Sequence, residues 1–210
     1  KLLELIETDE AGITNQQAAE YDYIIKKKKE KNNSNTKYEQ RTFGNCEFRV
    51  QETKKDGTYI EGHAAIFESY SQDLGGFKEI IEKNAFDNVL TDDVRALFNH
   101  DANQILGRTT SGTLKLEVDQ QGLKYRVKMP NTTYAKDLLE SMKRSDVNQS
   151  SFGFVIEDDD WKETKSGEVV RTIKSVSQLF DISPVTYPAY EGTNTQVAIR
   201  NLNKYKKNKK

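Results

Sequence analysis

Two runs of alternating apolar and polar residues, joined by a short turn, set the strongest limit on how this chain can fold. They occupy residues 113–118 and 123–129, and the turn Asp119-Gln120-Gln121-Gly122 separates them. Because successive side chains of a β-strand point to opposite faces, each run would bury one face and expose the other. The sequence therefore predicts an antiparallel hairpin in this region.

Similar patterns elsewhere extend the prediction to a protein built largely of strands. Residues 48–50 and 59–67 alternate around Lys54-Lys55-Asp56-Gly57, which predicts a second hairpin. Further strands are expected in residues 94–101, 169–173 and 177–183. The fold class is therefore expected to be mainly β with some α (α+β), and the folded domain is expected to begin near residue 45.

Helical spacing is found in two short segments. Thr133 can cap a helix whose apolar residues recur on one face, namely Ala135, Leu138, Leu139 and Met142. A shorter helix is expected from Asn84 to Leu90, with Phe86, Val89 and Leu90 on its buried side.

The two ends of the chain lack a clear packing pattern. Residues 1–23 show weak helical spacing, and a lysine-rich, low-complexity stretch at 26–35 predicts a flexible segment. After Arg200 the chain is basic, which predicts a disordered tail. We therefore expect an N-terminal helix and flexible segment over residues 1–44, a folded domain over 45–199 and a tail over 200–210.

Charge and cysteine content exclude several kinds of function. The formal net charge of -1 gives no reason to expect a nucleic-acid partner. Cys46 is the single cysteine, so neither an intramolecular disulfide nor a cysteine metal cluster can form.

The chain has no run of about 18 apolar residues, which predicts an intracellular protein without a membrane span. The acidic run 157–160 lacks the spacing of a calcium loop and is expected to be a solvated loop.

One predicted strand, residues 148–156, carries a hydroxyl group beside a packing face. Phe152 and Phe154 share the face that is expected to enter the core. Ser151 lies on the opposite face beside Gly153, whose missing side chain leaves room for a neighbouring backbone. Ser151 is therefore the candidate nucleophile, and a surface serine on an edge strand is the alternative interpretation.

A nucleophilic serine needs a base and an acid that orients the base. His63 and His100 are the available histidines; His63 lies within a strand, whereas His100 ends one, where functional residues are common. The candidate acids are Asp101, which would point away from His100, and Asp181, which lies in an otherwise apolar strand. A buried, unpaired carboxylate would be costly at Asp181, and a cationic partner would explain its place.

Five motifs occur in order between about residues 57 and 195. They are GHAAIF at 62–67, EIIEKNAF at 79–86, NHD at 99–101 with LGR at 106–108, SFGF at 151–154, and FDISPVTYPA at 180–189. Together they resemble the prohead protease family of tailed bacteriophages. By position, the resemblance assigns the base to His100, the nucleophile to Ser151 and the acid to Asp181. Ser150 places a second hydroxyl beside Ser151, so the identity of the nucleophile needs a test.

The resemblance implies a serine endopeptidase of the Ser-His-Asp type that needs no metal or cofactor. The expected fold is an antiparallel β-barrel of the herpesvirus-assemblin type surrounded by a few helices. The expected substrates are scaffolding protein, or the scaffolding extension of the major capsid protein, and the enzyme itself. The work would take place inside the immature phage capsid in the host cell cytoplasm, where the resemblance also allows self-association.

Two functions of other classes stay open at this point. A non-catalytic scaffold or capsid-assembly protein could retain the same barrel, and serine-directed reagents would then label nothing. A nucleic-acid-binding module could use the lysine-rich ends, and its binding would weaken steeply with salt. The near-neutral net charge and the acidic run 157–160 argue against the second of these.

Overall fold

A computed structural model describes residues 38–43, 48–53, 57–187 and 196–208, and the fold is given for these residues. They are mainly β-strand, with α-helices at α2 (Thr133–Lys143) and α3 (Gln196–Asn208). None of the helices in these ranges is long and apolar enough to cross a membrane. The helix expected in residues 1–23 and the lysine-rich stretch 26–35 lie outside the described residues.

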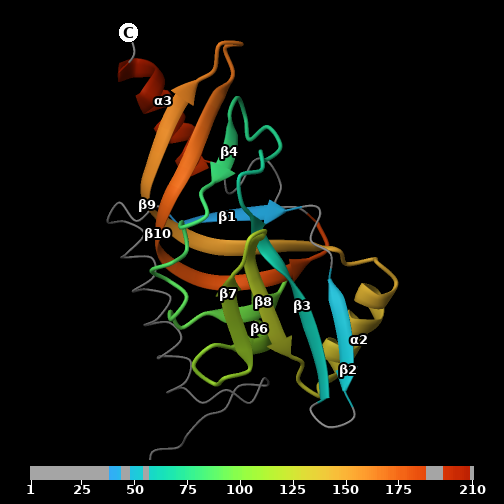
Figure 1. The fold of residues 1–210 in the computed structure, drawn as a ribbon. Helices are drawn as coiled ribbons and strands as arrows, with labels where there is room; N and C mark the ends of the chain where they lie inside the picture. The colour runs from blue at the N-terminus through green and yellow to red at the C-terminus, as the bar shows by residue number, and fades with distance from the viewer. Residues whose placement is uncertain (1–37, 44–47, 54–56, 188–195, 209–210) are drawn as a thin grey trace, which may run out of the picture. The chain divides into compact units, whose positions relative to one another are not determined.

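The strands form two sheets, and Figure 1 shows their arrangement. Five strands of the larger sheet have the order β1-β9-β10-β5-β6. The sixth strand, β4, also pairs with β10. Its strands are β1 (Tyr38–Phe43), β4 (Lys78–Ile81), β5 (Arg95–Phe98), β6 (Asp101–Arg108), β9 (Gln149–Glu163) and β10 (Val169–Val185). The smaller sheet has the order β2 (Arg49–Thr53), β3 (Gly57–Ile66), β8 (Gly122–Lys128) and β7 (Leu114–Val118).

Both hairpins predicted from alternation are confirmed. In the β7–β8 hairpin the register runs from Leu114 opposite Val127 to Val118 opposite Leu123. In the β2–β3 hairpin Thr53 lies opposite Gly57, so the two strands pair on either side of residues 54–56, as the sequence predicts. The alternation succeeds because one face of this sheet packs in the core and the other does not.

The two longest strands, β9 and β10, form the centre of the larger sheet. They pair antiparallel from Gln149 opposite Val185 to Glu163 opposite Val169, and Figure 1 shows both curving along their length. β1 pairs antiparallel with the other edge of β9, so the strand of Ser151 is central and not an edge strand. β4 and β5 pair with β10 in parallel, so the sheet is mixed and departs from the purely antiparallel sheet that we expected.

The structure differs from three expectations about loops and ends. Tyr38–Phe43 forms β1 and pairs with β9, so the described sheet includes residues that precede the expected domain start near residue 45. The acidic run 157–160 lies within β9, where Asp159 binds a buried arginine, and is not a solvated loop. The basic tail forms α3, because Ala198 and Leu202 supply an apolar side that packs with other buried residues.

The helix predicted after Thr133 is confirmed as α2, with Ala135, Leu138 and Met142 buried. Its N-cap residue is Thr132, whose side chain makes no capping hydrogen bond. The short helix expected from Asn84 to Leu90 forms a series of turns instead. Phe86 and Val89 are buried as predicted, whereas Leu90 is only partly buried. Burial of those two side chains in the core does not require a regular helix.

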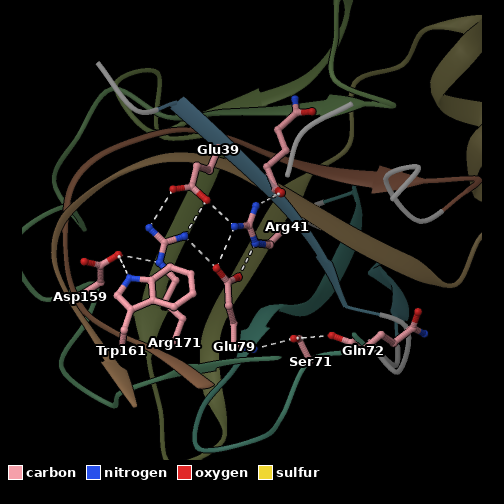
Figure 2. Close-up of polar contacts among 9 residues, drawn as sticks. Glu39, Arg41, Ser71, Gln72, Glu79, Asp159, Trp161 and Arg171 are labelled. Carbon is pink, nitrogen blue, oxygen red and sulfur yellow. Dashed lines mark hydrogen bonds and ion pairs between the residues drawn. The ribbon is translucent and has the colours of Figure 1, made fainter. Parts of the chain in front are cut away.

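A buried network of ion pairs joins β1, β4, β9 and β10 (Figure 2). Arg171 is fully buried and donates through Nη1 to Glu39 and Glu79, both at 2.9 Å, and through Nε to Asp159 at 2.6 Å. Arg41 also binds both Glu39 and Glu79. Burial opposes ionisation of Glu79, but the two guanidinium groups outweigh it and lower the pKa of this carboxyl. The network therefore fixes β1 to the strands that carry the candidate site.

Candidate active site

Ser151 lies near the start of β9, with Thr42 of β1 opposite it on one side and Ser183 of β10 on the other. Its neighbour Phe152 is fully buried and packs in the main core, as the alternation predicts. Ser151 is not a surface residue, however, because only 1% of it is exposed. Its hydroxyl points instead toward a histidine that arrives from another strand pair.

His100 brings an imidazole to this hydroxyl from the turn between β5 and β6. Asn99 and His100 have φ angles of 53° and 60°, as in a two-residue hairpin turn with both central residues in the left-handed region. The turn aims the ring back over the sheet, and Nε2 of His100 lies 2.7 Å from Oγ of Ser151. His100 therefore follows the end of its strand, since β5 ends at Phe98.

Asn99 ties this turn to the end of β10. Its backbone N–H donates to the carbonyl oxygen of Pro184 at 3.0 Å. Its side-chain oxygen Oδ1 accepts from the backbone N–H of Thr186 at 2.9 Å and from the Thr186 hydroxyl at 3.2 Å. These contacts fix the backbone next to His100, and nothing in the sequence pattern singled out Asn99 for this role.

Asp181 completes the arrangement from β10. Its Oδ2 lies 2.5 Å from Nδ1 of His100, on the side of the ring opposite Ser151. An irregularity between Leu179 and Asp181 shifts the register with β9 at this point. Leu179 and Ile182 can therefore both pack in the core, while the intervening Asp181 faces His100.

Gly153 leaves room for the carboxylate of Asp181. A Cβ atom at this position would lie 2.7 Å from Oδ1 of Asp181 and closer still to the hydroxyl of Tyr38. The glycine therefore accommodates two side chains, and not the neighbouring backbone that we expected. Burial, and to a smaller extent the Asp181 carboxylate, raises the pKa of Tyr38 above its ordinary value.

The neighbouring serine and the second histidine have other partners. Ser150 is fully buried, and its Oγ lies 3.3 Å from the hydroxyl of Tyr125. Alternation places it on the face opposite Ser151. Nε2 of His63 lies 2.9 Å from Oδ2 of Asp119, in the turn between β7 and β8. Both side chains are therefore engaged with partners other than the Ser151 hydroxyl.

Two further residues considered from the sequence are also engaged elsewhere. Oδ1 of Asp101 accepts from the backbone N–H of Asn103 at 2.9 Å, so it stabilises the start of β6. Arg108 binds Asp93 through Nε at 2.6 Å and Nη2 at 2.5 Å. The hydrogen bond from Arg108 is the main cause that lowers the pKa of Asp93. Arg108 is therefore a poor candidate for stabilising an oxyanion.

The three side chains form one continuous line of hydrogen bonds. With Nδ1–H of His100 donating to Asp181, Nε2 carries a lone pair that can accept the proton of Ser151. The carboxylate can also stabilise the imidazolium that this transfer forms. The arrangement is thus suited to nucleophilic catalysis by a hydroxyl group. In the part of the chain that the structure describes, no group of three or more His, Cys, Asp and Glu residues could hold a metal ion.

Comparisons with known proteins agree with this chemistry. Residues 45–208 match the model of a family described as caudovirus prohead serine protease. The prohead protease of Enterobacteria phage HK97 is 30% identical over 155 residues, which cover 71% of this chain and 64% of that protein. The chain thus spans less than two thirds of that relative's length. A solved structure of the bacteriophage T4 capsid assembly protease is 11% identical and covers 68% of this chain and 98% of its own. The TM-score between that structure and this chain is 0.35.

Proposed function

The chain belongs to the caudovirus prohead serine protease family, and from this premise we propose that it is a serine endopeptidase of capsid maturation with Ser151, His100 and Asp181 as its catalytic triad. The observation that carries the proposal is the line of hydrogen bonds from Ser151 through His100 to Asp181, at 2.7 and 2.5 Å. Family membership supports the reaction class, and the geometry supports the assignment of the roles.

The geometry suggests the following order of proton transfers. Nε2 of His100 takes the proton of Ser151 as Oγ attacks the scissile carbonyl carbon. The imidazolium, stabilised by Asp181, then gives this proton to the leaving amine, and an acyl-enzyme forms on Ser151. His100 next removes a proton from water, which attacks the acyl carbon, and the released Oγ regains a proton from His100.

The proposed substrates are the scaffolding protein, or a scaffolding extension of the major capsid protein, and the chain itself. The proposed place of action is the interior of the immature capsid in the host cell. The description of the family as prohead proteases supports both proposals. Self-association within the prohead remains part of the same proposal.

We also propose that the fold is a variant of the assemblin-type barrel. The curvature of β9 and β10 in Figure 1 supports a sheet that curls toward closure. This variant differs from a purely antiparallel barrel, because β10 pairs in parallel with β4 and β5. A barrel with a mixed sheet still leaves the face of Ser151 and Asp181 available to the His100 turn.

The two histidines offer a matched test of the proposed function. Immature capsids assembled from the phage's own capsid and scaffolding proteins are incubated with the purified chain, and all proteins are analysed by intact mass. The original chain and His63→Ala are expected to produce the same discrete truncations, because His63 pairs with Asp119 outside the triad. His100→Ala is expected to produce none in the same time, because Ser151 then lacks its base.

Two results would contradict the proposal. Equal cleavage by His100→Ala and the original chain would remove His100 from the mechanism. Failure of the original chain to cut capsid protein, scaffolding protein or itself would favour the non-catalytic scaffold instead.

A further inference from the structure

We propose that Ser183 is a positioning residue for this site, whose hydroxyl holds the carboxylate of Asp181 in the orientation that His100 requires. This inference rests on the proposed function, and it gives a role to a residue outside the proposed triad. Ser183 acts through Asp181. Its hydrogen bond to Asp181, its burial and its position in the strand register support this role.

The hydrogen bonds place two donors on one oxygen atom. Oγ of Ser183 donates to Oδ2 of Asp181 at 2.8 Å. The same Oδ2 lies 2.5 Å from Nδ1 of His100. Because both donors use Oδ2, the Ser183 hydroxyl favours the rotation of the carboxylate in which this oxygen faces the imidazole.

The surroundings make this bond hard to replace. Ser183 is fully buried, and Asp181 is only 6% exposed. A hydrogen bond to a charged group in a buried position contributes more than a neutral one at the surface, because water cannot easily take the place of the donor. Loss of the hydroxyl would therefore leave the carboxylate short of a donor.

The strand register explains why a serine is needed at this position. Ser183 lies opposite Ser151 in the β9–β10 pair, two residues beyond Asp181. The register shift before Asp181 places its side chain beside a glycine, so the sheet itself leaves space around Oδ1. The Ser183 hydroxyl holds the other oxygen, Oδ2, and so fixes a carboxylate that stands at an irregular point of the strand.

The test uses a fluorophosphonate ester, which reacts with activated serines and needs no knowledge of the cleavage site. Ser183→Ala is expected to lower the maximal rate of inactivation by about 10- to 100-fold, the loss typical of one hydrogen bond to a charged group. The reagent concentration for half-maximal rate should stay unchanged, because the proposed role of Ser183 is to orient Asp181 and not to bind the reagent. Ser177→Ala is the matched control, since this exposed serine of β10 donates to the carbonyl oxygen of Val155 and is expected to react at the original rate.

A second pair of variants separates positioning from a general structural role. In an Asp181→Ala background, Ser183→Ala is expected to cause no further loss, because the group through which Ser183 acts is already absent. A loss of the same factor in both backgrounds would contradict the proposal, as would an unchanged rate for Ser183→Ala alone. If the original chain does not react with the reagent, the proposed function fails, and that result differs from either of these.

Discussion

Ser151→Ala is expected to reduce cleavage of capsid protein, and of the chain itself, by roughly 10⁴-fold or more, the scale on which removal of a catalytic serine acts in triad enzymes. The physical reason is that Oγ of Ser151 is the hydroxyl within hydrogen-bond distance of Nε2 of His100, at 2.7 Å. Removal of one oxygen atom from this site should leave the fold intact. The measurement is the rate of product formation by intact mass, with circular dichroism to confirm folding.

Ser150→Ala is the matched control for this experiment. Ser150 stands next to Ser151 in the sequence, but its hydroxyl lies 3.3 Å from that of Tyr125 and is fully buried. Its loss removes a long hydrogen bond away from His100, so the cleavage rate should change by no more than a few-fold. An inactive Ser150→Ala together with an active Ser151→Ala would reverse the assignment of the nucleophile.

The second large effect is expected on stability, from Arg171→Ala in the buried network of Figure 2. The arginine is fully buried and binds Glu39, Glu79 and Asp159. Its removal leaves the buried carboxylates of Glu39 and Glu79 with Arg41 as the remaining guanidinium of the network. Breaking a buried ion pair from one side typically costs about 3–5 kcal/mol, and we expect a loss of this order in the free energy of unfolding.

Urea denaturation measures this loss, and Lys143→Ala provides the control. Lys143 forms an exposed ion pair with Glu52 at 2.6 Å, and exposed pairs contribute little because water and salt screen them. The denaturation midpoint of Lys143→Ala should therefore match that of the original chain. An equal midpoint for Arg171→Ala would show that the network does not stabilise the fold.

The same network predicts how stability depends on pH. The folded protein holds the pKa of Glu79 below its ordinary value, so the unfolded state binds protons first as the pH falls. The stabilisation is therefore present above about pH 4.5 and is lost progressively below it. The loss of stability on acidification should be smaller in Arg171→Ala, because Arg171 is one of the two charges that lower the pKa of Glu79.

Local patterns were sufficient where one face of a strand is apolar. Phe152 and Phe154 alternate with Ser151, so the face of the hydroxyl could be predicted from the sequence. The hairpins of the smaller sheet followed from the same alternation. Patterns could not pair His100 with Ser151, because 51 residues separate them and only the fold brings them together. The resemblance to a family supplied that pairing before the structure did.

The missed elements are segments whose charged residues conceal their packing in the sequence. Glu39 and Arg41 read as solvated residues in the sequence, but their pairing with Glu79 and Arg171 buries β1. The lysines of α3 similarly conceal an apolar side made by Ala198 and Leu202. Ion pairs between distant segments leave no periodic signal along the chain, so only the structure could reveal them.

The register shift before Asp181 was also hidden. A regular strand would place Leu179 and Asp181 on the same face, and the sequence reads as a continuous apolar strand with one costly carboxylate. The shift resolves this conflict, because it directs Asp181 toward His100 while Leu179 and Ile182 remain in the core. Sequence reasoning proposed Asp181 as a partner of His100 but could not show the backbone feature that directs it there.

The most direct test of the triad is to find the atom that becomes modified when the chain reacts with a fluorophosphonate. The protein is treated with the reagent, digested, and mapped by tandem mass spectrometry, with His100→Ala treated in parallel. We expect a single phosphonyl adduct on Ser151 in the original chain and none in His100→Ala over the same time. An adduct on Ser150 or another serine, or no adduct in the original chain, would contradict the account.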